Sequence, residues 1–157
     1  MLATFKAAVT NFFLSRTLNA ALPFAVLAIA LWRGDGRARL IAFVFAAQWT
    51  VDHFFPIPWI AATRMERGAR DLTGDLVALG VCLVALRGAR RYWVALVCGL
   101  ALLCVAVDVV FLMTPGMSAY TFVRADILIS YVQSAVLIWA SLTEHRRARL
   151  AEGAVEG

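Results

Sequence analysis

Long apolar runs separated by short charged segments dominate the chain. Each run approaches or reaches the length of about 20 residues that a helix needs to cross a bilayer. They predict five helices, at about residues 17–32, 40–61, 71–86, 92–113 and 120–142. The runs are continuously apolar, whereas the strands of a membrane barrel read as alternating segments of about 10 residues. The pattern therefore predicts an all-α integral membrane protein, a bundle of five transmembrane helices.

The ends of the chain and the breaks between the runs complete this outline. Residues 1–16 place apolar side chains at helical spacing, which predicts an interfacial helix or the start of the first span. A cleavable signal peptide is the alternative for this end. Pro56 and Pro58 are expected to kink or end the second helix. We expect residues 1–150 to form a single transmembrane domain and residues 151–157 to be a disordered tail.

Two pairs of helices resemble copies of one hairpin. Asp52 lies in an apolar run, and Asp108 recurs in a similar setting 56 positions later. Asp71 and Asp126 match at an offset of 55. These matches predict that the second and third helices and the fourth and fifth form a tandem two-helix repeat. Copies offset by two spans would be parallel, as in some transporter folds.

Composition and charge agree with a membrane location. Of the residues, 62% are hydrophobic and 16% are charged, against about 25% charged in soluble domains. The net charge of +5 comes from Arg residues that flank apolar runs, so lipid head groups explain it better than nucleic acid does. Nine Lys and Arg residues follow the first, third and fifth helices, and six lie on the other side. This predicts an inner-membrane protein of a bacterium, with its N-terminus outside and its C-terminus inside.

The three cysteines give no sign of a disulfide or a metal site. Cys82, Cys98 and Cys104 all lie inside apolar runs, and no C-x-x-C pair occurs. We expect them to be small buried hydrophobic residues. No cofactor is expected.

Four aspartates inside the apolar runs are the main candidates for function, namely Asp52, Asp75, Asp108 and Asp126. A carboxylate in a membrane span is uncommon enough to indicate a functional site. Asp52 and Asp108 precede the ends of their predicted helices, whereas Asp75 and Asp126 follow the starts of theirs. These ends and starts all lie on one side of the membrane, because neighbouring spans run in opposite directions. We therefore expect all four in one layer toward the extracytoplasmic side.

Further polar residues extend this layer at helical spacing. Gln48 precedes the first of these aspartates by one turn, and Gln133 follows the last by two turns. Arg67 and Arg124 are the expected charge partners. One interpretation is a structural network of ion pairs, and the other is a site for a cation, a proton or a cationic ligand. Whether that site holds a metal is left open.

These expectations leave three functions in order of preference. The first is a cation- or proton-linked transporter or ligand-binding protein. The second is a non-catalytic accessory subunit, in a homo-oligomer or with a protein partner, which would offer a face of small residues such as Gly99, Ala101, Ala135 and Ala140. The third is an intramembrane enzyme, although neither H-E-x-x-H nor G-x-S-x-G occurs.

Overall fold

The protein is all-helical over the part of the chain that the computed structural model describes, residues 20–54, 63–88 and 91–153. A first helix covers Ala20–Arg33. It is followed by α2 (Gly36–Phe54), α3 (Arg64–Leu86), α4 (Tyr92–Met113) and α5 (Ala119–Gly153). The expected helical class is confirmed, and so are the predicted bounds of the fourth helix. Residues 1–19 and 55–62, which include both prolines of the predicted kink, lie outside the described residues.

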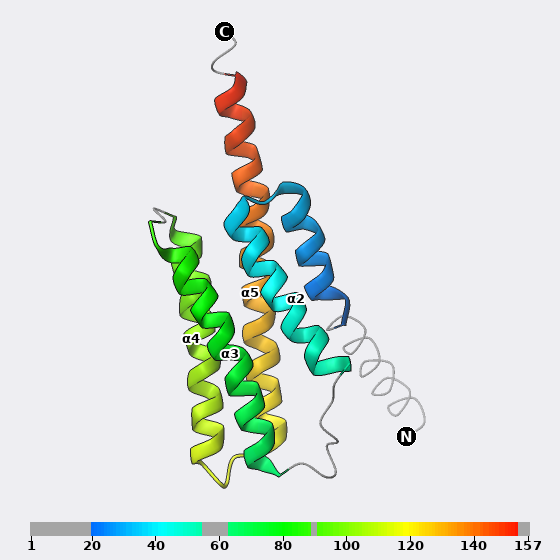
Figure 1. Ribbon diagram of the computed structural model, residues 1–157, viewed down its shortest axis with the longest axis vertical. Coiled ribbons are helices and arrows are strands. Elements are labelled where there is room, and N and C mark those ends of the chain that lie inside the picture. Colours follow the sequence, from blue (N-terminus) through cyan, green and yellow to red (C-terminus); the bar gives the residue numbers. More distant parts are fainter. Residues whose placement is uncertain (1–19, 55–62, 89–90, 154–157) are drawn as a thin grey trace, which may run out of the picture.

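The helices pack side by side along one long axis (Figure 1). The strongest packing joins α3 to α4 and α4 to α5, and α2 lies against α3 and α5. One end of the bundle carries the α4–α5 loop. The other end, called the arginine end below, carries the connections at residues 33–36 and 87–91. The tandem repeat has no support in this arrangement and stays a prediction.

The hydrophobic core lies nearer the arginine end. Its most completely buried large side chains are Ile41, Val94, Val97 and Leu137, each at 0% exposure. They come from α2, α4 and α5, and they hold these helices close together. The polar residues of the candidate site, described below, lie in the half of the bundle nearer the α4–α5 loop.

Helix α3 begins seven residues earlier than the hydropathy pattern predicts. Thr63 is its N-cap: the Thr63 hydroxyl accepts from the Glu66 backbone N–H at 3.2 Å. The Glu66 carboxylate in turn accepts from the Thr63 backbone N–H at 2.7 Å. This reciprocal pair is a capping box, whose T-x-x-E signature stands in the sequence. The segment expected to be a polar connection is therefore the first two turns of the helix.

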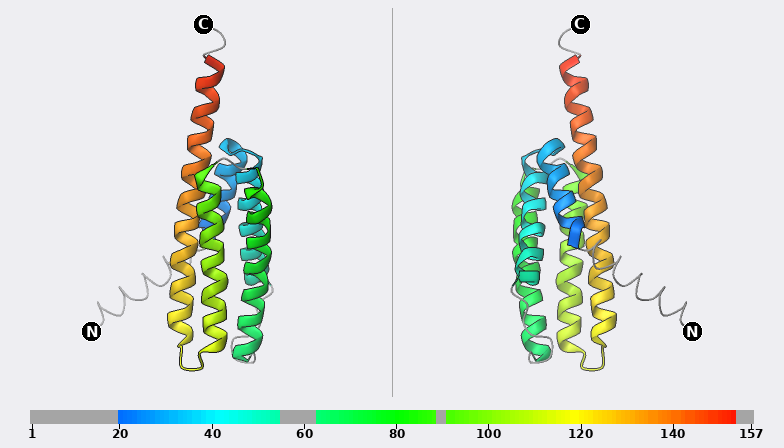
Figure 2. Two further views of the ribbon diagram at one scale, coloured as in Figure 1. Left: turned by 90° about the vertical axis from the view of Figure 1, so that its left-hand side faces the viewer. Right: turned by 90° about the vertical axis from the view of Figure 1, so that its right-hand side faces the viewer.

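Helix α5 runs past its expected end at residue 142 to Gly153. Its last turns extend beyond the other helices (Figure 2). The disordered tail was predicted for residues 151–157, and the helix includes the first three of these. The remaining four lie outside the described residues.

Ion pairs join three segments at the arginine end. The Arg91 Nη1 atom lies 2.7 Å from Asp35 Oδ2 and 2.7 Å from Glu144 Oε2. In addition, Arg37 donates a hydrogen bond of 3.4 Å to the Arg87 carbonyl oxygen. These contacts connect the start of α2, the α3–α4 connection and α5. Part of the charge at this end is therefore structural.

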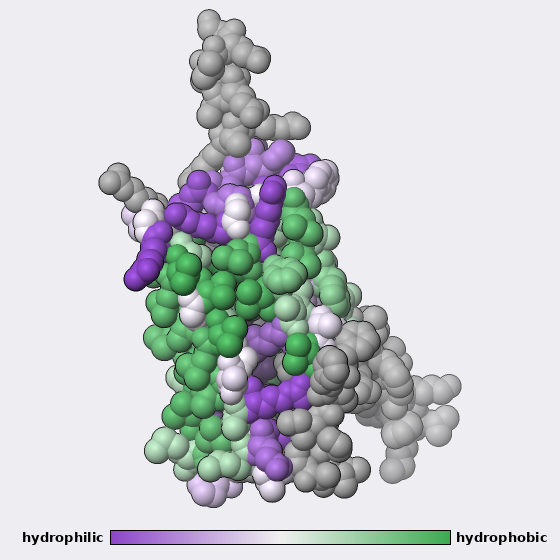
Figure 3. Space-filling view, viewed as in Figure 1, coloured by the Kyte–Doolittle hydropathy of each residue, from purple (hydrophilic) through white to green (hydrophobic). Residues whose placement is uncertain are grey.

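The outside of the bundle is apolar over much of its length. By length and composition, α4 and the Thr121–Arg146 part of α5 can cross a membrane, so the predicted five spans are supported in part. Among the described residues, 22 large hydrophobic side chains are exposed, on every helix. In Figure 3, hydrophobic residues cover most of the middle of one face. Polar residues gather at the arginine end and around a recess in the lower half.

Candidate functional site

A cavity of about 400 Å³ lies among the helices on the side of the α4–α5 loop. All five described helices contribute to its lining: the first turns of the first helix, the last described turns of α2, the first half of α3, the middle of α4 and the first half of α5. Five of the residues singled out in the sequence line it: Gln48, Arg67, Asp75, Asp126 and Gln133. Helical periodicity therefore brought most of the expected cluster to one place.

Two of the expected residues are hydrogen-bonded directly. The Gln48 side-chain amide donates to Asp75 Oδ1 at 2.8 Å. The contact depends on Gly74, because a Cβ atom at this position would lie 2.8 Å from Gln48 Nε2. The missing side chain lets an α2 amide lie against the backbone of α3. A glycine next to the aspartate is thus part of the site.

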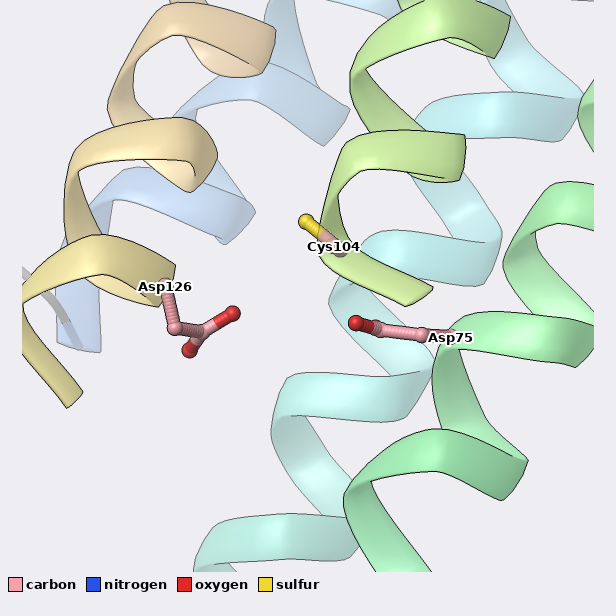
Figure 4. Close-up of side chains that lie close together, drawn as sticks. All are labelled: Asp75, Cys104 and Asp126. Carbon is pink, nitrogen blue, oxygen red and sulfur yellow. The ribbon is translucent and has the colours of Figure 1, made fainter. Parts of the chain in front are cut away.

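Asp75 and Asp126 face each other across the cavity, with Cys104 beside them. One ligand atom from each, the two carboxylate oxygens and the thiol sulfur, all lie within 4.8 Å of one another. Figure 4 shows the three side chains entering the same space from α3, α4 and α5. Cys104 is 5% exposed. This cluster, Asp75–Cys104–Asp126, has the residue types and the spacing of metal ligands.

The sequence interpretation missed Cys104, which was taken to be an ordinary buried residue. A signal was available, because Cys104 precedes Asp108 by four residues. Residues four apart on a helix share a face. The same reasoning that grouped the aspartates would have placed this thiol in their layer.

Asp108 is the most buried carboxyl group of the cluster, at 2% exposure. It does not line the cavity, but its carboxyl group lies close enough to that of Asp75 for the two to interact electrostatically. The Oδ2 atom of Asp108 has no hydrogen-bond partner among the described residues. Asp108 therefore adds a buried, unpaired carboxyl oxygen next to a residue that lines the cavity.

The first turns of α3 contribute positively charged side chains to the lining of the cavity. Arg67 and Arg70 both line it, together with Asp71, which follows Arg67 by four residues. Arg70 also donates to the Val51 carbonyl oxygen at 2.9 Å, near the end of α2. This hydrogen bond ties α3 to α2, and the structural ion-pair interpretation stays a prediction on this side of the cavity.

Two predicted members of the site are not part of the described cavity. Arg124 is exposed and is not among the residues that line the cavity. Asp52 lies in the last described turn of α2, and its side chain is outside the described part of the structure. The layer of four aspartates therefore stays a prediction.

The chain matches no protein-family model, and no curated protein and no solved structure is detectably similar to it. The fold and the site define a helical bundle with a partly open cavity that both polar and apolar side chains line. What this cavity can bind follows from its own side chains.

Proposed function

We propose that this chain is an integral membrane protein whose cavity binds a cation or a proton, as a small transporter or a ligand-binding protein. The observation that carries the proposal is the convergence of Asp75 and Asp126 on one cavity with Gln48 and Gln133. Carboxylate and amide oxygens are the ligands of hard cations. Carboxyl groups are also the usual proton carriers of membrane spans.

The shape of the bundle supports the membrane part of the proposal. Helix α4 has 22 residues, which corresponds to about 33 Å at 1.5 Å per residue. The hydrocarbon core of a bilayer is about 30 Å thick. Exposed side chains on this helix include Leu96, Leu102 and Val110. Lipid is the solvent in which such an apolar exterior is favourable.

The distribution of charge supports an orientation. Six described arginines lie at or near the arginine end: Arg33, Arg37, Arg39, Arg87, Arg91 and Arg146. The excess of Lys and Arg on cytoplasmic loops favours this end inside a bacterial inner membrane. In this orientation the cavity would lie toward the extracytoplasmic side.

The charge of the cavity supports a cationic ligand. Asp71, Asp75 and Asp126 line it against Arg67 and Arg70. The buried carboxyl group of Asp108 lies close to the carboxyl group of Asp75. When all these groups are ionised, the negative charges outnumber the positive ones by two. In a low-dielectric bundle such an excess is unfavourable, and a bound cation or added protons would remove it.

Thermal unfolding of the purified protein across pH and a panel of cations tests this proposal. A ligand that binds only the folded state at 100 times its dissociation constant stabilises it by about 2.7 kcal/mol. We expect one cation, or acid pH, to stabilise the wild type. Asp75→Asn and Asp126→Asn should abolish that response. Asp35→Asn is the control away from the cavity. It loses the ion pair with Arg91 and keeps a side chain able to cap Ala38, so it should change baseline stability but leave the cation response intact.

The contrary outcome is equally clear. If Asp75→Asn and Asp126→Asn lower stability by the same amount in every condition, the carboxylates serve a structural ion-pair network. The binding proposal then falls. If the response is present, flux of the stabilising ion into vesicles containing the protein separates a transporter from a ligand-binding protein.

The accessory-subunit alternative has less support. Of the four small residues expected to offer a face to a partner, Ala101 and Ala140 are buried within the core of the protein itself. Gly99 and Ala135 are exposed. Only two of these four residues are thus open to a partner. Stoichiometric co-purification of a second protein would revive this alternative.

A further inference from the structure

The Asp75–Cys104–Asp126 cluster differs from an ordinary group of acidic residues because a thiol lies within it. The donor atoms come from three separate helices and lie within 4.8 Å of one another. In a tetrahedral zinc site, the bond lengths of about 2.0–2.3 Å place donor atoms about 3.5 Å apart. Side-chain movements on the order of 1 Å would therefore close the cluster around an ion. The cavity leaves room for such movements (Figure 4).

The donor types discriminate among cations. Carboxylates alone would suit Mg²⁺ or Ca²⁺, which take oxygen ligands. A thiolate is a soft ligand and shifts preference toward zinc and related transition metals. Two carboxylates and one thiolate leave a fourth tetrahedral position for water or another group. That is the ligand pattern of an exchangeable site rather than of a closed structural one.

A second observation points to a ligand independently of the cluster. Asp108 lies one turn from Cys104 on the same helix and faces Asp75, and it is 2% exposed. Its Oδ2 atom has no hydrogen-bond partner among the described residues. A buried polar atom without a partner is costly, and native structures seldom leave one without a reason. A cation next to Asp75 would compensate this oxygen.

We propose that the cavity binds a divalent transition metal of the Zn²⁺ type through Asp75, Cys104 and Asp126. The inference rests on the proposed cation site and names its ion class. On binding, the Cys104 thiol releases its proton to solvent and the resulting thiolate sulfur bonds to the metal, so affinity falls as the pH is lowered. Asp108 stays outside the ligand set, and the nearby ion lowers the cost of its buried, unpaired oxygen.

Titration of the full-length protein with Co²⁺ tests the proposal, because a cobalt–thiolate bond adds a charge-transfer absorption band in the near ultraviolet. We expect the wild type to develop this band with one equivalent of Co²⁺, and Zn²⁺ to displace it. Cys104→Ser should abolish the band and weaken Zn²⁺ binding at least tenfold. The matched control is Cys82→Ser with Cys98→Ser, since both of these thiols are also buried and lie on α3 and α4.

Each other outcome overturns the inference in a distinguishable way. If the band survives Cys104→Ser and is lost in the Cys82→Ser/Cys98→Ser variant, the metal binds at that other pair of thiols. If only Mg²⁺, Ca²⁺ or a monovalent ion stabilises the protein, the cation site stands and its transition-metal character falls. If no cation and no pH change affects stability through Asp75 and Asp126, both proposals fall together.

Discussion

At the scale of single residues, the contact between Gln48 and Asp75 depends on a side chain that is missing. Gly74 lies in the interior of α3, where glycine is less favourable than alanine by about 1 kcal/mol. The approach of Gln48 Nε2 to this position gives a physical reason for the glycine. Gly74 therefore lowers the stability of the helix slightly, but it leaves space for the hydrogen bond between Gln48 and Asp75.

Gly74→Ala is expected to move Gln48 away from Asp75 and to weaken the cation response of the cavity. The added Cβ would lie 2.8 Å from Gln48 Nε2, so the amide must shift. Gly80→Ala is the matched control, because nothing lies within 4 Å of a Cβ at that helical position. It should stabilise the protein by about 0.5–1 kcal/mol without changing the response. The measurement is thermal unfolding with and without the stabilising ion. Equal responses in the two variants would contradict the role of Gly74.

Residue-level prediction from the sequence succeeded where helical periodicity was sufficient. Gln48, Asp75, Asp126 and Gln133 reach one cavity because each lies at a regular spacing on its helix. Cys104 was missed because hydropathy counts a buried thiol as a hydrophobic residue. Spacing along one helix shows which face of that helix a residue lies on, but not which residues of other helices it contacts.

At the scale of elements, the start of α3 shows what hydropathy alone cannot report. The hydropathy pattern reports apolar residues, so it started the predicted helix only after the polar residues 64–70. The backbone follows a different signal, the capping box between Thr63 and Glu66. The two added turns carry Arg67 and Arg70 to the cavity. The end of α5 was predicted too early for the same reason, since polar residues continue the helix there.

The capping box predicts a pH dependence of stability. The Thr63 backbone N–H, and after it the Thr63 hydroxyl, hydrogen-bond to Glu66 and hold the pKa of its carboxyl below the ordinary value of 4.5. A lowered folded-state pKa contributes stability that is present above pH 4.5 and is lost as the pH falls through the lower value. Unfolding measured from about pH 5 to about pH 3 should show this loss in the wild type. Glu66→Gln should lack this component.

The difference between wild type and Glu66→Gln isolates the effect from other carboxylates that titrate in this range. Thr63→Ala provides a second control at neutral pH. Removal of an N-cap hydroxyl should cost about 1 kcal/mol. Parallel pH curves for the wild type and Glu66→Gln would show that the capping box does not contribute.

At the scale of the whole molecule, the arginine end and the α4–α5 loop lie at opposite ends of the bundle (Figure 1). The helical class was predictable because continuous apolar runs of about 20 residues are typical of helices rather than strands. The packing partners were not, because all the runs are similarly apolar and hydropathy does not rank their contacts. The ion pairs of Arg91 with Asp35 and Glu144 join segments that are far apart in sequence.

Surface labelling in intact cells tests the proposed orientation. Gly116→Cys lies in the α4–α5 loop and Gly36→Cys lies at the arginine end, and both positions have open space for a side chain. A membrane-impermeant maleimide should label Gly116→Cys in intact cells and Gly36→Cys only after lysis. The three native cysteines are buried and give little background. The reverse pattern would invert the topology.

The length of α5 has a practical consequence for imaging this 157-residue chain. Its 35 residues span about 52 Å, against about 30 Å of hydrocarbon, so about 20 Å of the helix would project from a micelle. A small membrane protein without such a projection offers particle images no landmark for alignment. A larger rigid protein spliced onto this helix in register would turn with the bundle and so reveal its orientation in every image.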